Sequence, residues 1–130
     1  MRKLKIILLV SIFVLMTGCF NGQKSIELVK NSLAPNVISL FTGNKLTIGK
    51  VVGVTTNPTF KNFKENNNNF VEVSWDTQDK GTVKIIYLVN LETSKIQFSK
   101  IYSNNEQMNE IFYYAIMTAL TAEYNKNNNK

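Results

Sequence analysis

Four short segments between residues 59 and 102 are rich in β-branched and aromatic side chains, and each is bounded by turn-forming residues. The segments cover residues 59–64, 70–76, 82–90 and 95–102. This composition and spacing are typical of β-strands. The connections are too short for the crossover that parallel strands require, so neighbouring segments must pair antiparallel. The pattern therefore predicts an antiparallel meander of about four strands.

Alternate positions assign the faces of this predicted sheet. In the second segment the apolar set is Val71, Val73 and Trp75, opposite Glu72, Ser74 and Asp76. This strand should have one solvent-exposed face, with Trp75 in the core. In the third segment one set is Val83, Ile85, Tyr87 and Val89. The opposite set contains Ile86 and Leu88, which predicts a central strand that is covered on both faces.

Helices are expected on either side of the strand region, which makes the fold class α+β. Ser25 is suited to cap an N-terminal helix with Ile26, Val29 and Leu33 on one stripe, and Pro35 ends it. Residues 46–54 fit either a strand or a short helix capped by Thr47.

The clearest helical pattern follows the strands, with Asn104 or Asn105 as its cap. One apolar stripe, expected to lie on the sheet, contains Met108, Ile111, Phe112, Ala115 and Ala119. A second stripe on roughly the opposite side contains Tyr113, Met117, Leu120 and Tyr124. Either the N-terminal helix or its following loop covers the second stripe, or the stripe is an exposed patch that docks another protein.

Composition excludes several function classes. The chain contains no histidine, which removes Ser-His-Asp and Cys-His catalysis and the usual imidazole zinc sites. The acidic pair Asp76 and Asp79 fits a turn closed by Gly81 better than a metal loop. Arg2 is the sole arginine, and the lysines are scattered, so we expect no nucleic-acid binding. We expect no enzyme activity, no cofactor and no metal.

The pattern at the N-terminus is typical of an export signal peptide. Arg2, Lys3 and Lys5 precede an apolar run over residues 6–16, which is too short to span a bilayer. The run ends in Leu15-Met16-Thr17-Gly18-Cys19, which resembles the lipobox of bacterial lipoproteins, with Met16 where that pattern usually carries Leu. The resemblance implies that the thiol of Cys19, the one cysteine in the chain, is diacylated and that the peptide is then cut before it.

This resemblance divides the chain into a signal peptide (1–18), a tether (19–24), a single domain (25–124) and a disordered polar tail (125–130). Cleavage leaves 112 of the 130 residues and lowers the formal charge from +6 to +3, because three basic residues are removed. Phe20 stands where an Asp would mark retention in the inner membrane. We therefore expect an outer-membrane lipoprotein that faces the periplasm, or one on the outer leaflet of the plasma membrane in a monoderm.

A second, looser resemblance covers most of residues 25–124. Its motifs are Val29-Lys30-Asn31, Thr47-Ile48-Gly49-Lys50, Asn57-Pro58-Thr59-Phe60, Phe70-Val71-Glu72-Val73 and residues 84–91 followed by Thr93. They resemble a small domain of bacterial lipoproteins and envelope proteins, although that pattern has Trp in place of Phe60. The resemblance implies a helix over residues 48–54, a sheet flanked by helices, and no known catalysis.

The expected function is that of a membrane-anchored, non-catalytic module that binds an envelope protein or has a structural role. The alternative is a carrier of a small apolar ligand, held between the sheet and residues 111–120. A cavity of several hundred Å³ at that place would favour the carrier.

Overall fold

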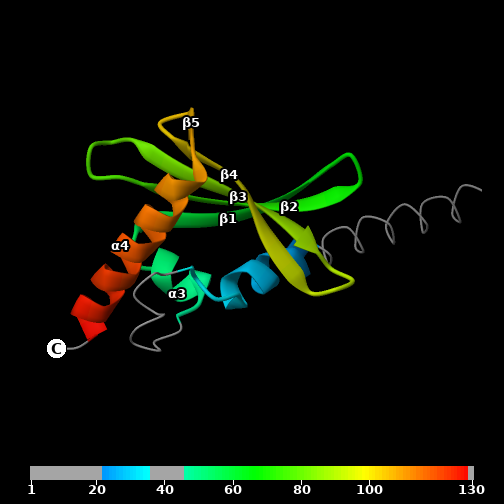
Figure 1. Ribbon diagram of the computed structural model, residues 1–130, viewed down its shortest axis with the longest axis horizontal. Coiled ribbons are helices and arrows are strands. Elements are labelled where there is room, and N and C mark those ends of the chain that lie inside the picture. Colours follow the sequence, from blue (N-terminus) through cyan, green and yellow to red (C-terminus); the bar gives the residue numbers. More distant parts are fainter. Residues whose placement is uncertain (1–21, 36–45, 129–130) are drawn as a thin grey trace, which may run out of the picture.

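A computed structural model describes residues 22–35 and 46–128 as an antiparallel sheet with helices packed on one face (Figure 1). The strands are β1 (Thr56–Glu65), β2 (Asn68–Asp76), β3 (Thr82–Asn90), β4 (Lys95–Ser103) and β5 (Glu106–Met108). The helices are α3 (Ile48–Val52), α4 (Glu110–Asn128) and an unlabelled helical segment over residues 22–31. This arrangement confirms the α+β class.

The sheet is a meander in which each strand pairs with its neighbour in sequence, in the order β1-β2-β3-β4-β5. The expected count of about four strands was one too low. Two of the turns are built from a pair of asparagines with positive φ, Asn66 with Asn67 and Asn104 with Asn105. Asparagine tolerates this left-handed conformation, which two-residue hairpin turns require at both central positions. The Asn104–Asn105 pair therefore starts β5 and does not cap the C-terminal helix.

Helix α4 begins four or five residues later than a cap at Asn105 or Asn104 would place it. The side chain of Asn109 accepts a hydrogen bond from the backbone N–H of Phe112 at 3.2 Å, as a cap does. At its other end the helix continues to Asn128, so the predicted disordered tail is wrong for residues 125–128. Lys126 in the last turn suits the negative end of the helix dipole. Residues 129–130 lie outside the described residues.

The N-terminal helix also differs from the prediction. The chain is already helical at residue 22, so Ser25 lies inside the helix, where it is buried, and does not cap it. Residues 22–24 belong to this helix and not to the expected tether. Leu33, expected on the apolar stripe, follows the helix, pairs with Thr47 in a single β-bridge and is 57% exposed.

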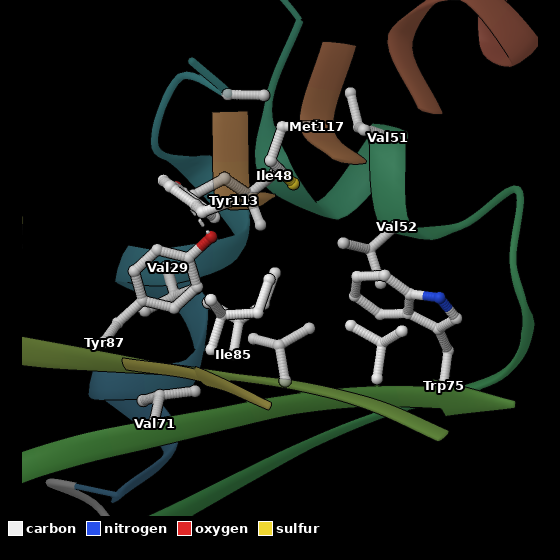
Figure 2. Close-up of a cluster of buried hydrophobic side chains, with 14 of the residues drawn as sticks. Val29, Ile48, Val51, Val52, Val71, Trp75, Ile85, Tyr87, Tyr113 and Met117 are labelled. Carbon is white, nitrogen blue, oxygen red and sulfur yellow. Dashed lines mark hydrogen bonds between the residues drawn. The ribbon is translucent and has the colours of Figure 1, made fainter. Parts of the chain in front are cut away.

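The ambiguous segment over residues 46–54 forms a helix, α3. Thr47 is its N-cap, and the hydroxyl of Thr47 accepts a hydrogen bond from the backbone N–H of Lys50. Ile48, Val51 and Val52 are buried, and Val52 lies on the side of α3 that faces Trp75 of the sheet (Figure 2).

One apolar core lies between the sheet and the three helical segments (Figure 2). As expected, β2 contributes Val71, Val73 and Trp75, and β3 contributes its larger set, Val83, Ile85, Tyr87 and Val89. The expectation that β3 is covered on both faces was wrong. Within residues 22–35 and 46–128 no helix lies on the other face, where Ile86 and Leu88 are half-buried among neighbouring side chains.

The segment between β2 and β3 is a turn, as predicted. The backbone N–H of Thr77 donates to the carbonyl of Gly81 at 3.0 Å, and the N–H of Gly81 donates to the hydroxyl of Thr77 at 3.1 Å. Asp79 is exposed at the tip of this turn.

Candidate functional site

The side of the sheet that the helices leave uncovered, which we call the open face, carries a pair of aromatic rings (Figure 1). Register places Phe63 of β1 opposite Phe70 of β2, and Phe70 opposite Leu88 of β3. Residues directly opposite each other share a face. The rings of Phe63 and Phe70 stack with centroids 5.1 Å apart and planes 13° apart.

Ile86 and Tyr102 extend this surface toward β4. Tyr102 lies opposite Lys84, and Ile86 lies opposite Lys100. A bulge in β4 directly precedes Lys100: Ile86 pairs with Lys100, but Tyr87, the next residue of β3, pairs with Phe98. The extra residue, Ser99, lets the strand bend at this point.

A groove of about 290 Å³ runs over the open face. Its apolar lining is Phe63, Phe70, Ile86 and Tyr102, and its polar lining is Glu65, Asn66, Asn68, Ser99 and Lys100. Aromatic anchors with charged and amide groups beside them are the composition of protein-binding surfaces. The groove offers no nucleophile activated by a base.

In the described residues no three His, Cys, Asp or Glu side chains come close enough together to hold a metal ion. No helix in the same part of the chain is long and apolar enough to cross a membrane.

The second stripe of α4 contributes buried residues to the core, whereas of the first stripe Phe112 packs against the core and Met108 lies in β5. Tyr113 is 4% exposed and Met117 is fully buried, and both point into the core (Figure 2). Ile111, expected on the sheet, is instead 75% exposed. The prediction of an exposed Tyr/Met docking patch is therefore wrong for Tyr113 and Met117.

Two further members of the proposed patch, Leu120 and Tyr124, are half-buried. Ala115 and Ala119, assigned to the sheet-facing stripe, are exposed. Cys19, the predicted lipidation site, lies outside the described residues, and its role stays a prediction.

Tyr113 is held in the core by other aromatic residues. Its ring stacks on Phe98 with centroids 4.3 Å apart and meets Tyr87 edge-on at 6.0 Å. The hydroxyls of Tyr87 and Tyr113 hydrogen-bond at 3.0 Å (Figure 2). Burial raises the pKa of Tyr113 to about 12, outweighing the opposite effect of its hydrogen bond to Tyr87. Burial, followed by repulsion from an ionised Tyr113, raises the pKa of Tyr87 well above its ordinary value.

The tyrosine pair predicts a loss of stability at alkaline pH. Between about pH 10 and about pH 12 the unfolded chain releases its tyrosine protons before the folded chain does, so stability falls as pH rises. The shift of Tyr113 alone corresponds to a decrease of order 2 kcal/mol in the free energy of unfolding. Urea titrations followed by far-ultraviolet circular dichroism would measure this decrease.

The matched control for this prediction is the double variant Tyr87→Phe with Tyr113→Phe. A single substitution would leave the other hydroxyl buried without its partner, whereas the double variant removes both. The double variant leaves the rest of the chain unchanged. Equal pH slopes for the wild type and the double variant would contradict the assignment.

The open face was not identified as a candidate site from the sequence. Phe70 shares its side of β2 with Glu72, Ser74 and Asp76, so alternation alone could have placed it there. Phe63, whose ring stacks on Phe70, could not be placed in this way, because its position depends on the register that the Asn66–Asn67 turn fixes.

The described residues form a small α+β domain with an antiparallel meander and an aromatic groove on its open face. No protein-family model, curated protein or solved structure matches this chain.

Proposed function

We propose that this chain is a membrane-anchored lipoprotein of the cell envelope that binds a protein partner and catalyses no reaction. The observation that carries the binding role is the open face. Stacked Phe63 and Phe70 rings, with Ile86 and Tyr102, line a groove that no helix of the described residues covers.

The composition of the open face favours a protein as the occupant. Aromatic residues dominate the binding energy of protein interfaces when they lie at the centre, with polar groups around them. Here the aromatic rings lie beside the exposed lysines Lys61 and Lys100 and beside Glu65. Such a rim suits a partner segment with an apolar centre and mixed charge.

The space between the sheet and α4 is less suited to a ligand. Ile85, Tyr87, Tyr113 and Met117 meet there and are each at most 4% exposed. A carrier would need these side chains to separate, and the core would lose their packing contacts. This packing favours the binding module over the small-molecule carrier.

The proposed location follows from the N-terminal pattern. A basic start, an apolar run and a small-residue approach to Cys19 support export followed by acylation of that thiol. We place the protein on the outer membrane, facing the periplasm, with the outer leaflet of the plasma membrane as the alternative in a monoderm.

Two tyrosines allow a matched crosslinking test of the binding surface. Tyr102 lines the open face, and Tyr114 is 41% exposed on α4. Each would be replaced by photoreactive benzoylphenylalanine in the full chain, and intact cells would be illuminated. We expect a discrete protein adduct from position 102 and none from position 114.

A second variant checks that the adduct reports specific docking. Phe63→Ser removes one ring of the stacked pair on an edge strand, where its effect on the core is small. We expect it to reduce the adduct at position 102 at least fivefold while thermal unfolding stays cooperative. No adduct at position 102, or equal adducts at both positions, would refute the proposed surface.

A further inference from the structure

The start of the described chain is fixed against the sheet. Gly22 is buried, and a methyl group added there would overlap the side-chain amide of Asn62 in β1. The same helical segment, residues 22–31, also contributes the fully buried Val29 to the core that it shares with the sheet. The position of Gly22 relative to the sheet is therefore determined by packing.

Gly22 lies toward one end of the domain. In Figure 1 the blue start of this helix is at the end that carries the β1–β2 and β3–β4 turns. We call this end, formed by residues 66–67 and 91–94, the turn end. The turn at residues 77–81 and the last residues of α4 lie at the opposite end. The nine residues of β3 separate the two ends by about 30 Å.

The chain between Gly22 and the proposed lipid anchor is very short. Only Phe20 and Asn21 separate Cys19 from Gly22, so the two Cα atoms can be at most about 11 Å apart. This reach is well under half of the 30 Å length of the domain. If Cys19 carries acyl chains in the bilayer, the domain cannot turn its opposite end toward the membrane.

We propose that the turn end is a lipid-facing surface that rests against the headgroup layer; this inference depends on the acylation of Cys19 proposed above. In this orientation the open face is turned neither toward the bilayer nor away from it, and the plane of the sheet stands roughly perpendicular to the membrane. A partner that docks there must itself lie close to the bilayer.

The chemistry of the turn end suits headgroups. A depression of about 430 Å³ there is lined by residues 67–69, which are asparagines, by Asn90 and Glu92, and by Leu88, Val89 and Leu91. Asparagine amides both donate and accept hydrogen bonds, which matches the phosphate and ester oxygens of lipids. Lys64 and Lys95 are balanced by Glu65 and Glu92, so this contact does not require anionic lipids.

Energy transfer to labelled lipids tests the orientation. The full chain, acylated in cells and purified, would be reconstituted in phosphatidylcholine vesicles that carry a headgroup-linked acceptor dye. Asn67→Cys places a donor dye at the turn end, and Asp79→Cys places the same dye at the far turn. If Cys19 is acylated, each introduced cysteine is the one free thiol.

We expect transfer efficiency from position 67 to exceed that from position 79 at least twofold. Equal efficiencies, or greater transfer from position 79, in vesicle-bound protein would refute the orientation and leave the lipid anchor intact. Protein that fails to float with the vesicles would refute the acylation and the orientation together.

Lengthening the tether tests its role. Ten Gly and Ser residues inserted between Asn21 and Gly22 extend the typical reach to about 20 Å. We expect the ratio of the two efficiencies to fall toward one. A ratio that the insertion leaves unchanged would refute the short tether as the cause of the orientation.

Discussion

Replacing Met117 by alanine is expected to lower the free energy of unfolding by about 2–5 kcal/mol, whereas Ile111→Ala should change it by no more than about 0.5 kcal/mol. Met117 has no exposed surface, and its removal leaves a cavity beneath α4. Ile111 lies on the same helix and is 75% exposed. The two positions lose side chains of similar size, so the difference isolates burial.

Urea unfolding of the two variants, followed by the fluorescence of Trp75, would measure this difference. Trp75 is the one tryptophan of the chain and lies in the core at 6% exposure. Alanine also has a higher helix propensity than isoleucine, which offsets part of any loss at position 111. An Ile111→Ala variant as unstable as Met117→Ala would mean that α4 packs on the sheet through the other stripe.

Cys19→Ser is expected to abolish acylation and to remove the protein from the membrane fraction. A serine hydroxyl cannot replace the thiol that accepts the lipid, and no other cysteine is present. Each buried CH₂ of an acyl chain contributes about 0.8 kcal/mol to membrane binding, so the loss of several chains reduces binding to background. Metabolic labelling with palmitate and intact mass measurement would show the change.

Met16→Leu is the matched control for the anchor. It restores the leucine that the lipobox pattern usually carries and keeps the thiol, so labelling should equal that of the wild type. A wild-type N-terminus other than a lipid-modified residue 19 would contradict the prediction. Equal membrane retention of Cys19→Ser and wild type would contradict it as well.

The sheet was predictable because its signal is local. Alternation along residues 70–76 and 82–90 marked the buried faces of β2 and β3, and short connections fixed the antiparallel pairing. β5 was missed because three residues give too few alternations to recognise. Asn104 and Asn105 added to the ambiguity, since asparagine suits both a helix cap and a left-handed turn position. A pair of adjacent asparagines, present also at Asn66–Asn67, was the available signal.

The orientation of α4 was not predictable from periodicity alone. Both stripes are continuous, and a helix of this kind can pack through either one. The size of the side chains distinguishes the two stripes. Tyr113 and Met117 bury more apolar area than Ala115 and Ala119 would, and exposing an alanine side chain costs little free energy. The buried hydroxyl of Tyr113 also required a partner, and Tyr87 supplies it from β3. That pairing depends on three-dimensional proximity, which sequence spacing does not reveal.

The irregular start of β1 has a consequence for contacts between copies of this protein. Along its outer side, β1 pairs with no other strand of the described chain, and such a side can recruit a strand from a neighbouring molecule. Pro58 lacks an N–H group to offer, and the register shifts between Thr56 and Thr59. Exposed Lys61 and Lys64 repel the same strand of a second copy. These features disfavour strand pairing between β1 and a second molecule, which is the contact that fibre growth requires.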